Sequence, residues 1–359
     1  MTRLPMKSFL IMATGVTVAA TLLTSEAATK PAGTKARASG RASLPTRSAE
    51  PYLGAIVVDA ESGQVLFEQN ADQAGFPASV IKLMGACVIL DRVAEGQLSL
   101  SNLVTVTAES SKIGGSQVFL AEHETFPVED LFYALMVQSA NDAASALAIH
   151  VAGTAAGFVE MMNKKAAALN MTHTRFHSVH GLPPAAGQEG DVSSARDLAA
   201  LARELIHAHP EILRFTSTRE RGFRNGAFIL RNHNPLLATY QGCDGLKTGY
   251  ITAGGFSIIA TAERNGRRVI AVVLGSKDRL IRNRQAAELL SKGFAALPPL
   301  PPPVATNAVP TNAVIIPPEP AGEIEVEGGS KHWMTAGLGM LGGLFLAGIV
   351  AWVVRRGNR

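Results

Sequence analysis

Pro77-Ala-Ser-Val-Ile-Lys-Leu-Met-Gly-Ala-Cys-Val-Ile-Leu90 is the stretch that decides the fold, because it places a hydroxyl and an amine three residues apart at the start of an apolar helix. Residues at this spacing share one helix face, so Ser79 and Lys82 are expected to face each other. Pro77 precedes the apolar run and puts Ser79 in the first turn, where unpaired backbone N–H groups can stabilise an oxyanion. Lys82 can be the base for Ser79 only if burial or a second cation lowers the pKa of its amine. The rest of the chain must supply that cation.

Two further motifs with polar side chains follow in the order Ser139-Ala-Asn141 and Lys247-Thr-Gly249. The first lies between helical patterns over 128–138 and 141–150, so we expect it on a tight connection that holds its side chains rigidly. Helix capping is the other common use of Ser and Asn at such a position. A Ser-x-x-Lys pair alone is often a chance occurrence, whereas the ordered trio is specific.

The secondary-structure patterns place strands at both ends of a central region and helices between them. Residues 52–59 and 64–69 predict a β-hairpin, and a mostly helical stretch follows from about 100 to 210. Further strands are predicted at 228–231, 247–250, 256–263 and 268–275, and an Asn265-Gly266 turn joins the last two. A closing helix is predicted at 280–297. Its apolar side chains are expected to pack on the sheet: Leu280, Ala287, Leu290 and Phe294. This order predicts an α/β (α+β) fold, an antiparallel sheet flanked by helices with an inserted helical subdomain, and a cleft between the two.

The N-terminal 50 residues differ in composition from the central region. Residues 1–27 begin with Arg3 and Lys7, continue through an apolar run from Phe9 to Leu23 and reach small residues, which predicts a secretory signal peptide, with an uncleaved anchor as the alternative. Residues 28–50 hold almost no large apolar side chain and are expected to form a disordered basic tether. The globular domain is therefore predicted to span residues 51–296.

The C-terminal segment predicts a membrane anchor. Residues 297–332 are proline-rich and indicate an extended linker. Residues 333–354 carry no charge and, at about 1.5 Å per residue, are long enough to cross a bilayer. The arginines of the tail, residues 355–359, belong on the cytoplasmic side. We therefore expect a single-pass protein of the cell membrane whose catalytic domain lies on the periplasmic or extracytoplasmic side.

The net charge of +4 gives no indication of a nucleic-acid partner. Residues 51–296 hold 22 Lys and Arg against 23 Asp and Glu, so the excess positive charge lies in the terminal segments. The only two cysteines, Cys87 and Cys243, are interpreted as small buried side chains, with a disulfide as the alternative in an exported protein. No run of Cys, His and carboxylates has metal-ligand spacing, so neither a metal nor a cofactor is expected.

The three motifs match the serine penicillin-recognising enzymes. Over residues 51–296 the chain resembles a low-molecular-mass penicillin-binding protein of the D-alanyl-D-alanine carboxypeptidase family of serine peptidases. Blocks that resemble the family are Pro77-Ala-Ser79, Gln138-Ser-Ala-Asn-Asp-Ala143, His180-Gly-Leu182, Asn232-His-Asn234 with Leu236-Leu237, and Asp244-Gly-Leu-Lys-Thr-Gly-Tyr250. Ile81 stands where the family usually has Thr, and Pro183 where it often has Asp, but neither departure removes a reacting group. The resemblance implies a β-lactamase/transpeptidase-like fold.

The resemblance also implies the catalytic roles. Ser79 would be the acylated nucleophile and Lys82, kept neutral near Lys247, would be its base. Ser139 would relay a proton to the leaving D-alanine, and Asn141 would hold Lys82 and the substrate amide. The implied partners are a peptidoglycan stem peptide ending in D-Ala-D-Ala, and β-lactam antibiotics.

Substrate-binding roles follow from the same resemblance. Lys247 and Thr248 would meet the terminal carboxylate from an edge strand, and Gly249 would let the substrate backbone approach closely. The backbone N–H groups of Ser79 and Tyr250 would form the oxyanion hole. Arg284, near the start of the last predicted helix, is a further candidate for the carboxylate, with an exposed helical arginine as the alternative.

Three other functions stay open beside the carboxypeptidase. A D-alanyl-D-alanine endopeptidase would use the same residues on a peptidoglycan cross-link. A class A-like β-lactamase needs a glutamate that holds the deacylating water, and residues 177–184 offer none. A non-catalytic wall-binding module would keep the fold without the chemistry, and the intact trio argues against it.

Overall fold

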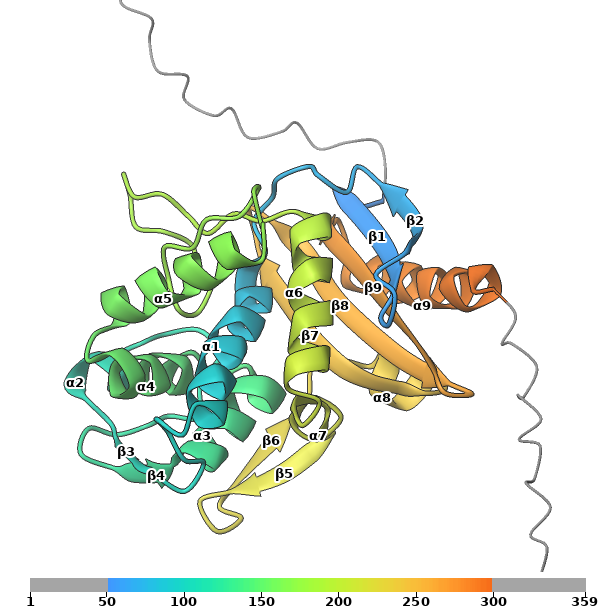
Figure 1. The fold of residues 1–359 in the computed structure, drawn as a ribbon. Helices are drawn as coiled ribbons and strands as arrows, with labels where there is room; N and C mark the ends of the chain where they lie inside the picture. Colours follow the sequence, from blue (N-terminus) through green and yellow to red (C-terminus); the bar gives the residue numbers. More distant parts are fainter. Residues whose placement is uncertain (1–50, 299–359) are drawn as a thin grey trace, which may run out of the picture. The chain divides into compact units, whose positions relative to one another are not determined.

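The computed structural model describes residues 51–298, and a five-stranded antiparallel sheet forms their centre (Figure 1). The strands lie in the order β2-β1-β9-β8-β7, so the first and last parts of the domain pair with each other at β1 and β9. Their bounds are Gly54–Asp59 for β1, Val65–Gln69 for β2, Cys243–Ile251 for β7, Gly255–Arg264 for β8 and Arg267–Ser276 for β9. The predicted N-terminal hairpin and the Asn265-Gly266 hairpin are both confirmed.

Helices cover both faces of this sheet, which explains why its central strands are apolar throughout. Helix α9, Arg279–Ala296, lies against one face, while α1, Lys82–Ala94, and α6, Ala195–Ala208, lie on the other (Figure 1). Successive side chains of a strand point to opposite faces, so Ala55 and Val57 join the core under α9, whereas Ile56 and Val58 join the larger core under α1 and α6. The predicted fold class is therefore confirmed.

The helical subdomain is inserted between β2 and β7 and packs around α1. Its central members are α4, Asn141–Ala152, and α5, Ala155–Ala168, both in contact with α1. The smaller elements are η1 Ala78–Ile81, β3 Leu103–Thr105, α2 Ala108–Ser111, β4 Thr125–Pro127, α3 Val128–Tyr133, the π-helical turn η2 Ala134–Gln138, α7 Ile212–Thr216, β5 Glu220–Phe223, β6 Phe228–Arg231 and α8 Leu236–Thr239.

The closing helix differs from its predicted packing at one position. Asp278 caps α9 by accepting hydrogen bonds from the N–H groups of Leu280 and Ile281, so the helix begins at Arg279. Leu280 then lies in the first turn and is 69% exposed, and its expected packing on the sheet is wrong. Leu290 is buried as expected, and Ala287 and Phe294 are half-buried against the same core.

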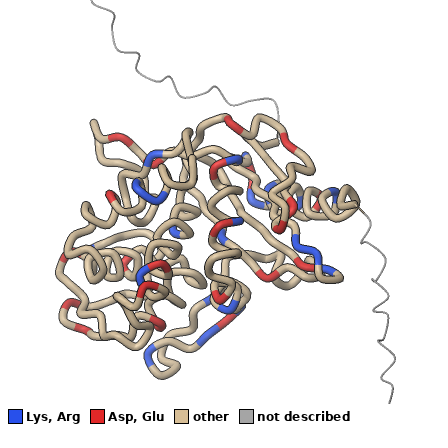
Figure 2. The backbone as a smooth tube through the Cα atoms, viewed as in Figure 1, with Lys and Arg blue, Asp and Glu red and all other residues tan. Residues whose placement is uncertain are grey.

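Charged residues of both signs are distributed along the described part of the chain, in agreement with the nearly balanced count (Figure 2). Within residues 51–298 no single helix has the length and apolar character to span a bilayer, and α4 and α5 meet that criterion only as a pair bent by 84°. The predicted signal peptide (1–27), tether (28–50), transmembrane helix (333–354) and tail (355–359), and all but the first two residues of the linker (297–332), lie outside the described residues.

Candidate active site

Ser79 and Lys82 meet at the junction of two helical segments, as predicted. Ser79 lies in the 3-10 turn η1, and Lys82 is the first residue of the α-helix that continues from it. The Nζ atom of Lys82 is 2.8 Å from Oγ of Ser79. The lysine is fully buried, whereas the serine is half-buried and lines a cleft.

The surroundings of Lys82 fix the direction of its lone pair. Nζ also donates to Oδ1 of Asn141 at 2.6 Å and to the backbone oxygen of His180 at 2.9 Å. A neutral amine has two N–H bonds and one lone pair, and these two acceptors, both carbonyl oxygens, take the two N–H bonds. The lone pair is left for the Ser79 hydroxyl, which is the arrangement that a general base needs.

Burial and a neighbouring cation favour that neutral amine. Burial lowers the pKa of Lys82 well below its usual value, and the positive charge of Lys247 lowers it further, against the opposing charges of Asp142 and Asp191. The pKa of Lys247 is itself lowered to about 7, first by burial and then by the charge of Arg282. The structure thus supplies the second cation that the sequence requires.

Ser139 and Asn141 are held by an unusual backbone path. The π-helical turn η2 ends at Ser139, whose φ of 61° is left-handed, a conformation that costs energy for a residue other than glycine and is common at functional sites. Asn141 then opens α4, and its Nδ2 donates to the oxygen of Gly114 at 2.7 Å, which aims Oδ1 at Lys82. The Ser139 hydroxyl has no hydrogen-bond partner among residues 51–298 and faces the cleft.

Two glycines let their chain segments touch the nucleophile. Strand β7 is an edge strand that packs on η1, and a Cβ on Gly249 would lie 2.6 Å from the oxygen of Pro77 and 3.1 Å from the nitrogen of Ser79. Gly181 has a φ of 80°, and a Cβ there would collide with the backbone of Ala78. Only glycine therefore permits the approach of either segment to Ser79.

The cleft has a volume of about 760 Å³ and gathers most of the predicted residues. Six of them line it: Ser79, Ser139, Asn141, Thr248, Gly249 and Tyr250. Lys82 and Lys247 are buried beneath its surface. These eight residues lie up to 171 positions apart in the sequence, and the structure brings them together at the cleft.

Arg284 is the predicted site residue that does not reach the cleft. Its side chain is 67% exposed and lies 4.0 Å from Glu288 on the same helix. Arg282 lines the cleft instead, buried, with Nη1 donating to the oxygen of Ser257 at 3.2 Å and with Nε and Nη2 donating to Asn283. Two residues turn the side chain by about 200° around an α-helix, so a sequence pattern uncertain by two positions selects the wrong face.

His233 also lines the cleft, and the sequence predicts no role for it, although it belongs to the block Asn232-His-Asn234 that resembles the family. Burial lowers the pKa of His233 to about 4, with further lowering by the charges of Lys247, Lys82 and Arg282. The imidazole is therefore neutral near pH 7 and adds no charge to the cleft.

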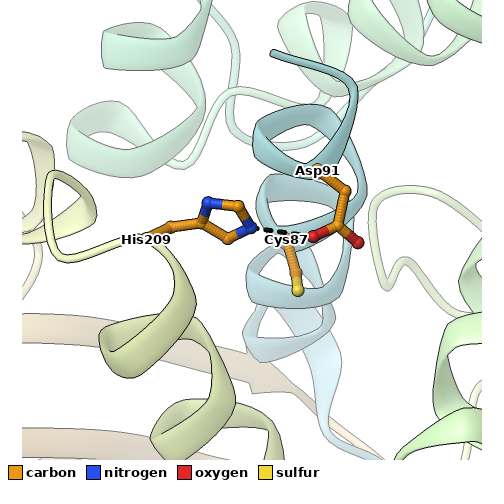
Figure 3. A group of neighbouring side chains, drawn as sticks. All are labelled: Cys87, Asp91 and His209. Carbon is orange, nitrogen blue, oxygen red and sulfur yellow. Dashed lines mark hydrogen bonds and ion pairs between the residues drawn. The ribbon is translucent and has the colours of Figure 1, made fainter. Parts of the chain in front are cut away.

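Cys87, Asp91 and His209 form a separate cluster that does not line the cleft (Figure 3). Cys87 and Asp91 are one turn apart on α1, His209 follows α6, and one potential ligand atom from each lies within 4.8 Å of the others. Sequence spacing does not reveal this group, because His209 is 118 residues beyond Asp91.

A hydrogen bond and ion pairs already hold the side chains of this cluster. Nε2 of His209 is 2.8 Å from Oδ1 of Asp91, and Nζ of Lys165 is 3.2 Å from Oδ2 of Asp91 and 3.0 Å from Glu204. Burial raises the pKa of the Cys87 thiol to about 12, which disfavours the thiolate that binds metals. These residues therefore connect α1, α5 and α6.

A family model and sequence relatives of this chain indicate the same family. A family model described as D-alanyl-D-alanine carboxypeptidase matches residues 42–278. The D-alanyl-D-alanine carboxypeptidase DacF of Bacillus subtilis is 34% identical over 244 residues, which are 67% of this chain and 61% of the relative. DacC of Escherichia coli is 37% identical over 246 residues, 67% of this chain and 60% of that protein. The chain thus spans about three fifths of the length of these relatives.

Solved structures agree with the sequence relatives. Penicillin-binding protein D2 from Listeria monocytogenes in its ampicillin-bound form is 35% identical with a TM-score of 0.62, covering 70% of this chain and 100% of its own. Penicillin-binding protein 6B from Escherichia coli is 35% identical with a TM-score of 0.64, covering 70% of this chain and 80% of its own. Together with the Ser79–Lys82 geometry, these matches show that the chain belongs to the D-alanyl-D-alanine carboxypeptidase family.

Proposed function

We propose that this protein is a serine-type D-alanyl-D-alanine carboxypeptidase that removes the terminal D-alanine from peptidoglycan stem pentapeptides through an acyl-enzyme on Ser79. The observation that carries the proposal is the contact of the Ser79 hydroxyl with a buried amine, whose two N–H bonds are taken by other acceptors. An acyl transfer needs this kind of activated hydroxyl at the edge of an open cleft.

Acylation follows from the positions of the side chains. The Ser79 proton moves to Nζ of Lys82 while Oγ bonds to the carbonyl carbon of the penultimate D-alanine. The negative charge on the carbonyl oxygen is stabilised by the backbone N–H groups of Ser79 and Tyr250. Ser139 passes the proton from Lys82 to the amine of the leaving D-alanine as the C–N bond breaks.

Deacylation uses the same base. Lys82, neutral again, takes a proton from a water molecule whose oxygen attacks the ester carbon, and the proton returns to Oγ of Ser79. The described residues that line the cleft include no carboxylate, so no glutamate is present there to hold this water as in a class A β-lactamase. We therefore expect penicillins to acylate Ser79 and the resulting acyl-enzyme to be hydrolysed slowly.

The terminal carboxylate of the substrate is recognised by cations and a hydroxyl on one side of the cleft. Thr248 and Arg282 line the cleft, and Lys247 is buried next to Thr248 in β7, where the charge of Arg282 lowers its pKa. We assign to Arg282 the role that the family resemblance implies for Arg284, because a buried guanidinium at the cleft wall can pair with a carboxylate and an exposed one turned away cannot.

The test is covalent labelling together with product release. The full-length protein should be labelled by a fluorescent penicillin and should release D-alanine from a stem pentapeptide, and Ser79→Ala should lose both activities. Ser291→Ala, an exposed hydroxyl on α9, is the matched control and should keep both. Labelling that persists in Ser79→Ala would remove the nucleophile assignment.

An endopeptidase acting on cross-linked stems is the second candidate, since it would use the same residues of the cleft. A cross-linked stem dimer in the same assay distinguishes the two, because only an endopeptidase splits it into monomers.

We propose further that the protein is exported and held at the membrane by residues 333–354, with the catalytic domain outside the cytoplasm. The uncharged stretch followed by Arg355 and Arg356 supports this orientation. The proline-rich linker would let the cleft reach wall polymer at a distance from the bilayer.

A further inference from the structure

The outer part of the cleft carries a cation and an apolar surface that the proposed chemistry does not use. Arg279 and Leu280, the first two residues of α9, line the cleft and are exposed. Beside them in the lining are Tyr250, which is 52% exposed, and Phe256, whose ring stacks on that of Tyr250 at 4.2 Å. Exposed large apolar groups next to a binding site indicate a contact surface for a ligand.

Arg279 has no ion pair within residues 51–298. It is the first residue of a helix, where the helix dipole disfavours a positive charge. The neighbouring carboxylate of Asp278 is occupied in capping the N–H groups of Leu280 and Ile281. Asp278 interacts with Arg279 through its charge, but among the described residues no side chain forms a hydrogen bond or a close ion pair with the Arg279 guanidinium.

Arg279 is also coupled electrostatically to Arg282 and, through Arg282, to the two lysines near Ser79. Its charge lowers the pKa of Arg282, the charge of Arg282 lowers that of Lys247, and the charge of Lys247 lowers that of Lys82. Such repulsion weakens each charged form; Asp142 and Asp191 oppose it at Lys82, and the described lining of the cleft adds no further carboxylate. An anionic ligand would relieve it.

We propose that Arg279, with Leu280 and the Tyr250–Phe256 pair, forms a subsite for the third residue of the stem peptide and favours a diamino acid that bears a free side-chain carboxylate. This inference rests on the proposed function, because the terminal carboxylate occupies Arg282 and Lys247 and so leaves Arg279 for a second anionic group. The methylene groups of the same side chain would contact Leu280 and Tyr250.

The spacing of the two arginines suits two carboxylates on one peptide. Arg279 and Arg282 are three residues apart on a helix, so their Cβ atoms are about 5–6 Å apart. The third residue of an extended peptide lies two positions from its terminal fifth residue, at roughly 3.3–3.6 Å per position. The two arginine Cβ atoms are thus about 5–6 Å apart, and the third and fifth residues of the peptide are about 7 Å apart. The long arginine side chains can span the difference between these two distances.

The experiment compares three pentapeptides that end in D-Ala-D-Ala and share an amidated second residue. The third residue is a diamino acid with a free carboxylate, the same residue as its carboxamide, or lysine. The kcat/KM for each is measured for the full-length parent, for Arg279→Gln and for Arg284→Gln, an arginine of the same helix that is turned away from the cleft.

The parent should prefer the free carboxylate to the carboxamide by about fivefold, the discrimination that one partly exposed ion pair provides. In Arg279→Gln this preference should disappear, because kcat/KM falls for the peptide with the free carboxylate and stays unchanged for the other two peptides. Arg279→Lys should keep part of the preference, and Arg284→Gln should keep all of it. A parent without the preference, or an Arg279→Gln variant that retains it, would overturn the subsite while leaving the carboxypeptidase intact. Failure to hydrolyse any of the three peptides would instead remove the proposed function on which the subsite depends.

Discussion

Gly249→Ala tests whether the approach of β7 to the nucleophile determines the rate. The added Cβ would lie 2.6 Å from the oxygen of Pro77 and 3.1 Å from the nitrogens of Ser79 and Val80. All three are backbone atoms, which cannot rotate away as a side-chain end can. Ordinary van der Waals contact begins near 3.4 Å, so β7 and η1 must separate by about 0.8 Å, the difference between 3.4 and 2.6 Å.

A displacement of this size should lower the rate strongly while leaving the protein folded. Misplacing reacting groups by about 1 Å costs on the order of 10²-fold in rate, whereas overpacking costs roughly 1–3 kcal/mol of folding free energy. We expect kcat/KM for the pentapeptide to fall by about 10²-fold, and the thermal midpoint of unfolding to fall by only about 2–4 °C per kcal/mol lost.

The control for this variant is Gly222→Ala on β5, where the added Cβ would meet the nearest atom at 3.5 Å, an ordinary contact. That variant should keep parental activity. Parental activity in Gly249→Ala would refute the reasoning, because β7 could then move from Ser79 without consequence for the reaction.

Three further predictions follow from the cleft charges and the chain ends. Lys247→Ala removes the cation that lowers the pKa of Lys82, so the acid limb of the pH profile of kcat/KM should move to higher pH, and an unmoved limb would contradict the coupling. Arg282→Gln should raise KM about tenfold or more, because it removes a charge-assisted contact with the substrate carboxylate. The control variant Arg284→Gln should leave KM unchanged. An equal change of KM in the two variants would remove the assignment of Arg282. The full-length protein should remain with membranes in an alkaline carbonate wash, whereas a chain truncated before residue 333 is released, and release of the full-length protein would exclude a spanning anchor.

The sequence predicts those features that depend on local pattern. Asn265-Gly266 has positive φ angles of 51° and 69° at its two residues, the conformation that its residue types favour, so the β8–β9 hairpin could be located to within a residue or two. Ser79 and Lys82 are neighbours in sequence, and their contact follows from helix geometry alone.

Features that depend on tertiary register could not be predicted in this way. Leu280 satisfies the apolar pattern of α9 but lies in the exposed first turn, because the Asp278 cap sets where the helix starts. The same register moves Arg282 into the cleft and Arg284 out of it. His209 reaches Asp91 only after the subdomain has folded around α1, so no spacing rule in the sequence can pair them.

The buried lysines that make the site reactive should also weaken the fold near neutral pH. Lys247 is protonated in the unfolded chain up to about its usual pKa of 10.5, whereas burial lowers its pKa in the folded protein to about 7. Between these values the unfolded state binds more protons, so the free energy of unfolding rises with pH. The destabilising contribution is absent above about pH 10.5, grows as the pH falls and is complete below about pH 7. Lys247→Met should therefore be more stable than the parent at pH 7 and lose this advantage towards pH 10, while its peptidase activity is reduced. Denaturant titration at the two pH values measures this difference, and a variant less stable than the parent at pH 7 would show that Lys247 supports the fold as well as the reaction.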